Sequence, residues 1–140
     1  MLEPSKFKHR KAFKGRNTGI SRSNTLPSFG MYALKTLENV RITAVQIEAA
    51  RRVINRTLKR SGNIWILVFP DIPVTAKPTD SRMGKGKGSL SHWICRAKAG
   101  KILFEVDGVS EELARFALEK AAYKIPVKCK FISSVIGGMK

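Results

Sequence analysis

The chain has 140 residues, of which 27 are Lys or Arg and 10 are Asp or Glu, for a net charge of +17. Its 43% of hydrophobic residues can form a core, which excludes wholesale disorder and predicts one domain, or one domain with a tail. This much like charge stays compact when a polyanion neutralises it, and nucleic acid is the commonest polyanion. The longest apolar run, residues 64–69, is too short to span a membrane, so an anionic membrane is the weaker alternative.

The N-terminal part of the chain, residues 1–40, is predicted to be an extended basic arm. No acidic residue lies between Pro4 and Leu37, while seven Lys and Arg residues fall within residues 6–22. Glycines and prolines interrupt any helical period. Because the positive charges repel one another and little apolar surface can be buried, we expect the free arm to be largely disordered in water.

The rest of the chain, residues 41–140, is predicted to form a single α+β domain. Thr43 and Gln46 fit a capping box at the start of a helix that ends near Arg60, and apolar residues recur along it at helical spacing. The apolar run at residues 64–69 predicts a strand buried on both faces, stopped by the prolines that follow it.

The C-terminal half of the sequence predicts strand, turn, strand, helix and strand. Residues 89–98 and 101–107 are expected to pair as a hairpin around Gly100. Ser110 can cap a second helix, and the alternating residues 127–131 predict a half-exposed last strand. The expected fold is a two-layer sandwich of two helices on a mostly antiparallel sheet, with the basic arm extended from it and a Gly/Lys-rich loop protruding.

A predicted loop over residues 73–88 contains the most unusual segment of the chain, in which glycines alternate with other residues, mostly cations. The spacing matches neither the P-loop nor the GxGxxG dinucleotide fingerprint. Two interpretations stay open: a solvated hairpin tip, or a finger whose glycines let the backbone approach phosphates. We favour the finger, because three cations with no nearby acid have little structural use. The segment consists of Arg82, Met83, Gly84, Lys85, Gly86, Lys87 and Gly88.

The predicted first helix carries a stripe of basic residues. Charge runs on helices are commonly solvated faces, and that is the plain alternative. Glu48 is the only acidic residue of this helix, however, so pairing within the helix cannot account for all the cations. Five of the ten acidic residues fall instead between Glu105 and Glu119, which predicts one face turned away from nucleic acid. The basic stripe, a second predicted nucleic-acid surface, consists of Arg51, Arg52, Arg56, Lys59 and Arg60.

Residues that carry chemistry are too scattered to predict an enzyme or a metal site. His9 and His92 have no partner at metal-ligand spacing, and Cys95 and Cys129 show no CxxC pattern, so two reduced thiols are expected. We therefore expect no catalytic residue, no metal and no cofactor. The alternatives are a small RNA-modifying or nucleotide-handling enzyme, and a free-standing binder of nucleic acid or of a membrane surface.

An ordered series of segments covers nearly the whole chain. It includes His9-Arg10-Lys11, Lys14-Gly15-Arg16-Asn17, Gln46-Ile47-Glu48-Ala49-Ala50-Arg51-Arg52, Val68-Phe69-Pro70-Asp71, Asp107-Gly108-Val109 and Lys124-Ile125-Pro126. Residues 82–88 belong to it as one unbroken block. Together these segments resemble the bacterial-type L-sixteen family of large-subunit ribosomal proteins. No single motif carries the resemblance, which depends on their order.

The resemblance implies an α+β domain seated on large-subunit rRNA, with the arm threaded between rRNA helices. It implies that residues 82–88 point toward tRNA in the aminoacyl site, with the peptidyl site as an open alternative. Neighbouring large-subunit ribosomal proteins are implied as further partners, while catalysis, cofactors and membrane contact are not. The residues expected to bind rRNA are Lys6, Lys8, His9, Arg10, Lys11, Lys14, Arg16, Asn17, Arg22, Arg51, Arg52, Arg56, Lys59 and Arg60.

Departures from the family pattern bear on the compartment. Leu67 and Ile72 stand where many relatives have basic residues, and such drift looks more organellar than bacterial. Because the resemblance begins at Met1, we expect no transit extension: either an organelle encodes the protein, or an extension has been removed. We therefore expect a ribosome of the mitochondrial matrix, with a bacterial cytoplasmic or a plastid ribosome as alternatives.

Overall fold

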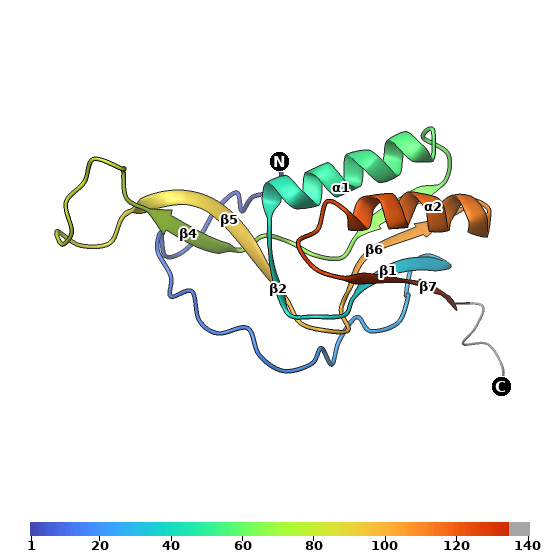
Figure 1. The fold of residues 1–140 in the computed structure, drawn as a ribbon, viewed down its shortest axis with the longest axis horizontal. Helices are drawn as coiled ribbons and strands as arrows, with labels where there is room; N and C mark the ends of the chain where they lie inside the picture. The colour runs from blue at the N-terminus through green and yellow to red at the C-terminus, as the bar shows by residue number, and fades with distance from the viewer. Residues whose placement is uncertain (135–140) are drawn as a thin grey trace.

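The structure, a computed structural model, describes residues 1–134. Over these residues the chain forms two helices and two antiparallel sheets, so the predicted α+β class is confirmed (Figure 1). Residues 135–140 of the predicted domain lie outside the described residues. The elements in chain order are β1 (Tyr32–Thr36), β2 (Val40–Thr43), α1 (Ala44–Thr57), β3 (Asn63–Ile66), β4 (Ile72–Ala76), β5 (Ser89–Ala97), β6 (Ile102–Asp107), α2 (Glu111–Ala122) and β7 (Cys129–Ser133).

The larger sheet has the strand order β3-β6-β1-β7, and both helices lie on the same side of it (Figure 1). Its central strands β6 and β1 supply Phe104 and Leu34, which are completely buried beneath the helices. Ile47 and Ile54 of α1 and Leu118 of α2 close the same core. These are large apolar side chains at helical and strand spacing, whose removal from water is the main stabilising contribution.

The smaller sheet has the order β2-β5-β4 and carries the Gly/Lys-rich loop at its far end (Figure 1). β4 and β5 pair as a hairpin, and residues 77–88 form the loop between them. Pro73 lies in β4, which is an edge strand, where the missing N–H of proline costs no internal ladder bond.

The predicted hairpin of residues 89–98 and 101–107 is wrong, although both strands exist. β5 pairs with β2 and β4, whereas β6 pairs with β1 and β3 in the other sheet. The turn at Gly100, whose φ is +88°, therefore carries the chain from one sheet to the other. The prediction failed because β1 and β2, the strands that separate the pair, lie in or beside the segment assigned to the arm.

The first helix begins as predicted. The Thr43 side chain accepts a hydrogen bond from the N–H of Gln46, and the Gln46 side chain accepts one from the N–H of Thr43. The helix ends at Thr57, earlier than predicted, because Lys59 and Arg60 take left-handed backbone conformations with φ of 52° and 66°. Such conformations cannot continue a right-handed helix.

The strand predicted at residues 64–69 is shorter and more exposed than expected. β3 ends at Ile66 and pairs with β6 alone, so it is an edge strand whose side chains from Ile64 onward are half-buried. The prediction of burial on both faces is wrong, because an apolar run does not reveal which faces its neighbours cover. Val68, beyond the end of β3, does enter the core.

The N-terminal segment is extended, as predicted, and contains no helix or strand before Tyr32 apart from an isolated bridge between Ile20 and Ala99. Its C-terminal limit differs from the prediction, because β1 pairs on both sides with β6 and β7. The arm therefore comprises residues 1–31 rather than residues 1–40. From its start on the helix side of the view it passes β4 and β5, and its later part then follows the side of the domain opposite to the helices before it enters β1 (Figure 1).

Candidate nucleic-acid interface

The Gly/Lys loop, residues 82–88, projects from the smaller sheet and is exposed up to Gly88. Gly84, Lys85 and Gly86 have φ of +88°, +58° and +84°, so three successive residues are left-handed. Glycine adopts this conformation without the steric cost of a Cβ atom. A Cβ atom on Gly84 or Gly86 would meet nothing within 4 Å. These glycines are therefore required by backbone conformation and leave both faces of the loop tip open to a ligand.

The base of the Gly/Lys loop is closely packed. A Cβ atom on Gly88 would lie 2.4 Å from the carbonyl oxygen of Ala76, so only glycine fits where the two strands of the hairpin diverge. The Lys77 ammonium also donates to the carbonyl of Gly84 across the loop. The loop thus has a firm base, while its tip cations, Arg82 and Lys85, make no side-chain hydrogen bond within residues 1–134.

The arm braces this loop. The Lys87 ammonium donates to the carbonyl of Ala12 at 2.6 Å, and the Lys11 ammonium donates to the carbonyl of Lys87 at 2.9 Å. Lys87 also lies over the Phe13 ring, 5.5 Å from its centroid. Lys11 and Lys87, two residues predicted to contact RNA, therefore join two basic segments that are 76 residues apart in sequence.

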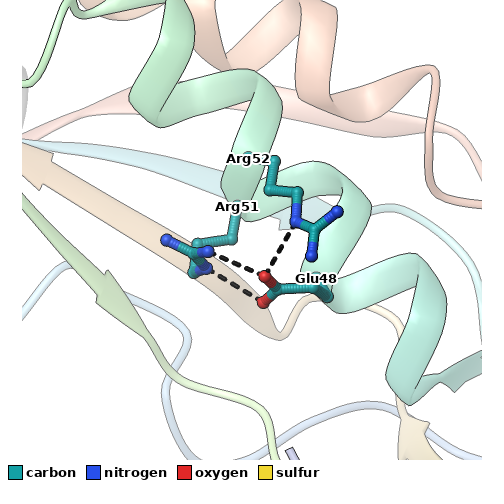
Figure 2. A network of polar contacts seen from close by, with 3 residues as sticks. All are labelled: Glu48, Arg51 and Arg52. Atoms are coloured by element: carbon teal, nitrogen blue, oxygen red, sulfur yellow. Dashed lines mark hydrogen bonds and ion pairs between the residues drawn. The ribbon is translucent and has the colours of Figure 1, made fainter. Parts of the chain in front are cut away.

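The basic stripe on α1 divides into two parts. Glu48 accepts hydrogen bonds from Arg51 at 2.7 Å and from Arg52 at 3.0 Å (Figure 2). The hydrogen bond from Arg51 and the positive charges beside it lower the pKa of the Glu48 carboxyl from its ordinary 4.5 to about 2, against the opposing effect of burial. Among the described residues, Arg56, Lys59 and Arg60 have no acidic partner, and they line one open hollow together with Arg52 and Asn55.

The arm is held on the domain by bonds to the main chain. The Asn17 side chain donates to the carbonyls of Val40 at 3.0 Å and Ala97 at 2.9 Å, which are paired residues of β2 and β5. Asn17 was predicted to bind rRNA, but its amide points into the protein instead. In the opposite direction, Arg41 donates to the carbonyl of Gly15 at 2.6 Å. The arm expected to be disordered in the free protein is thus docked in the structure.

A buried carboxylate fastens the end of the arm. Glu105 of β6 is fully buried, and its carboxylate accepts hydrogen bonds from the backbone N–H groups of Ser28, Phe29 and Gly30 at 2.6–3.2 Å. The Phe29 ring stacks on Trp65, with centroids 6.2 Å apart. Glu105 therefore does not belong to the predicted acidic face. The signal that could have separated it from its acidic neighbours is its place within an apolar strand.

The other sequence-predicted RNA residues of the arm lie at the surface. They are exposed and come from an extended segment, so their cations are free to meet phosphates. These residues are Lys6, Lys8, His9, Arg10, Lys14, Arg16 and Arg22.

Three further cations, which sequence reasoning missed, belong to the candidate interface. Arg96, Lys98 and Lys101 lie at the ends of β5 and β6, beside arm residues 19–23. The available signal was alternation in β5, where exposed Arg96 and Lys98 flank the buried Ala97. The sequence could not show that the arm returns to the same place.

Within residues 1–134 no three His, Cys, Asp or Glu side chains are grouped so as to hold a metal ion. Cys95 and Cys129 are free, as expected, and burial raises the pKa of both thiols, that of Cys129 to about 11. Neither helix in residues 1–134 is long and apolar enough to cross a membrane.

Residues 4–132 match the family described as ribosomal protein L16p/L10e. The chain belongs to this family. The prediction of membership is therefore confirmed, and so is the prediction of a non-enzymatic protein, because this is a family of ribosomal proteins.

Individual members of the L16p/L10e family match over nearly their full length. The protein of Chelativorans sp. (strain BNC1), named large ribosomal subunit protein uL16, is 56% identical over 96% of this chain and 98% of its own. That of Bartonella bacilliformis is 56% identical over 97% and 99%, and that of Sinorhizobium medicae is 53% identical over 96% and 98%. These relatives are bacterial, so they support the bacterial alternative and give no support to the mitochondrial expectation.

Proposed function

We propose that the protein is a non-enzymatic constituent of the large ribosomal subunit that binds rRNA through the arm and the basic stripe. The observation that carries this proposal is the large excess of positive over negative charge on a member of the L16p/L10e family. Three ion pairs are found within residues 1–134, and all three are within a helix, which leaves most of the Lys and Arg residues of this range without an acidic partner. Phosphates would neutralise them, and contacts of this kind read RNA shape more than sequence.

The Gly/Lys loop is proposed to lie beside tRNA in the aminoacyl site, with the peptidyl site as the neighbouring alternative. Support comes from its exposed tip, where Met83 is 96% exposed and Gly84 and Gly86 allow close approach. The brace between Lys87 and arm residues would hold the loop at a set angle when the arm is fixed in rRNA. Its two unengaged cations, Arg82 and Lys85, are the proposed tRNA contacts.

The outer face of α2 is proposed to meet neighbouring ribosomal proteins rather than RNA. Glu111, Glu112 and Glu119 are exposed there, and carboxylates repel phosphates. The same face exposes Phe116 and Tyr123, which are 52% and 87% exposed. Lys120 lies over the Phe116 ring and Arg115 pairs with Glu111, so this face carries charges of both signs around its aromatic side chains. Such a surface favours a protein partner.

Sedimentation of the tagged protein from a bacterial lysate tests the main proposal. The protein should migrate with large subunits and translating ribosomes at moderate and at high salt, and RNase treatment should release it. The cytoplasm of a bacterium is the proposed compartment, on the strength of the bacterial relatives. Migration at the top of the gradient, or salt-labile binding spread over many RNAs, would reject a built-in ribosomal component.

The tRNA part of the proposal needs its own variants. Arg82→Ala and Lys85→Ala should weaken tRNA binding to the aminoacyl site or delay late subunit assembly, with unfolding temperature unchanged, because neither side chain supports the core. Lys124→Ala, which removes one exposed cation near the end of α2, is the matched control. Normal tRNA binding and assembly in both loop variants would remove the loop from this role and leave rRNA binding intact.

A further inference from the structure

The hollow between the arm and the turn at Gly100 is a concave surface with a strongly positive lining. It encloses roughly 860 Å³ and is lined by residues 19–23 of the arm and by the ends of β5 and β6. Its charged lining is entirely cationic and consists of Arg22, Arg96, Lys98 and Lys101. This set is called the cationic hollow below.

The arm builds one wall of the cationic hollow. Ile20 forms a bridge with Ala99, and the Ser21 N–H donates to the carbonyl of Ala99 at 2.9 Å. Gly19 has a φ of +88°, and a Cβ atom placed there would lie 3.9 Å from the Lys98 ammonium. Two segments distant in the sequence, the arm and the turn that joins β5 to β6, therefore converge on one concave surface.

The cations of the hollow have no acidic partner among residues 1–134. Arg96 donates to the carbonyl of Lys14 at 3.3 Å, while Arg22, Lys98 and Lys101 make no side-chain hydrogen bond or ion pair. Holding four like charges around one concavity is unfavourable in the free protein. An anionic ligand that enters the hollow would remove this repulsion.

We propose that the cationic hollow binds a sharp turn of unpaired RNA, where the backbone folds back and its phosphates crowd together. This inference rests on the proposed function and identifies the form of RNA that one part of the surface takes. A concave site fits a convex ligand, and cations on the arm and on the facing turn of residues 96–101 screen phosphates that approach one another from two sides. Ile20, which is 75% exposed at the rim, offers an apolar surface to a splayed base or ribose.

Salt dependence of binding tests the hollow. The probe is large-subunit rRNA from Sinorhizobium medicae, whose uL16 is 53% identical to this chain. The logarithm of the RNA-binding constant falls linearly with the logarithm of the salt concentration, and each lost contact to a single-strand phosphate makes this slope about 0.7 less steep. The double variant Lys98→Ser with Lys101→Ser should therefore have a slope about 1.4 less steep than that of the wild type. Over a fourfold rise in salt, the wild-type protein should then lose about sevenfold more affinity than this double variant.

The matched control is Lys124→Ser with Lys128→Ser, which removes the same charge from exposed residues outside the hollow. It should keep the wild-type slope. Arg22→Ala guards against misfolding, because this exposed arm side chain makes no hydrogen bond or ion pair within residues 1–134 and should still lower the slope by about 0.7. Lys98→Arg with Lys101→Arg should restore the slope.

Hydroxyl-radical footprinting on the same rRNA identifies the ligand. The Ser double variant should lose protection over one short unpaired stretch and keep it elsewhere. If the Ser double variant loses protection only over a continuous duplex, or if its salt slope equals that of the control, the proposed RNA site in the cationic hollow is wrong while rRNA binding by the protein stands. If the wild-type protein itself fails to bind this rRNA, the proposed function fails instead.

Discussion

Glu105→Gln removes the buried charge that fastens the end of the arm to β6. In the structure one carboxylate accepts N–H bonds from Ser28, Phe29 and Gly30, the shortest at 2.6 Å. Hydrogen bonds to a charged group contribute about 1.5–3 kcal/mol each, but their effects are not additive. Glutamine keeps one acceptor oxygen and turns an N–H₂ group toward three donors.

The expected loss in the free energy of unfolding is about 2–4 kcal/mol, because the removed charge also no longer has to be buried. At about 4 °C per kcal/mol for a chain of this size, the unfolding temperature should fall by about 8–16 °C. Differential scanning calorimetry measures this fall. Limited proteolysis should show faster cleavage at residues 24–30, which cover the Glu105 side of the sheet.

Glu119→Gln is the matched control, since it removes the same charge from an exposed side chain of α2 that makes no hydrogen bond or ion pair within residues 1–134. Its unfolding temperature should stay within about 2 °C of the wild type. Equal unfolding temperatures for Glu105→Gln and Glu119→Gln would show that the buried carboxylate does not anchor the arm.

Three further tests address separate parts of the structure. Gly88→Ala should lower the unfolding temperature more than Gly84→Ala, because its Cβ would meet main chain at 2.4 Å, whereas that of Gly84 meets open space and adds only the strain of an alanine at a φ of +88°. Equal unfolding temperatures would refute the tight loop base. In the wild type, Glu48 should contribute less than about 1 kcal/mol to the free energy of unfolding above a pH of about 4.5, and this contribution should be lost as the pH falls through about 2. Glu48→Gln should lack the contribution at every pH, and urea unfolding across this pH window measures the difference. Alkylation of Cys129 by iodoacetamide should be slow at neutral pH and accelerate toward pH 11, and fast labelling at pH 7 would contradict its burial.

Local signals in the sequence were sufficient for the first helix. The reciprocal capping box of Thr43 and Gln46 involves residues only three positions apart, and the apolar stripe of α1 repeats at the period of the helix itself. The sequence also predicted an exposed loop at the Gly/Lys loop, because its left-handed conformations are local properties of Gly84 and Gly86. Composition alone indicated a polyanionic partner, since charge balance does not depend on the fold.

Long-range pairing was beyond sequence reasoning. β5 and β6 are adjacent in sequence but belong to different sheets, because β1 and β2 supply partners that their short apolar patterns did not reveal. Charge in the sequence could not show whether Glu105 faces solvent or the backbone of residues 28–30, nor that Asn17 turns inward. The same limit hid the cationic hollow, whose cations come from segments about 75 residues apart.

The sequence by itself determined the charge, the family, the class of fold and the local shape of the helices and the loop tip. Only the tertiary structure decided which strands pair, where the arm ends, and which cations remain free of partners. The physical reason is that helix caps and left-handed glycines are set by neighbours a few residues away. Strand pairing and buried charges depend instead on contacts between distant segments, whose geometry no local pattern encodes.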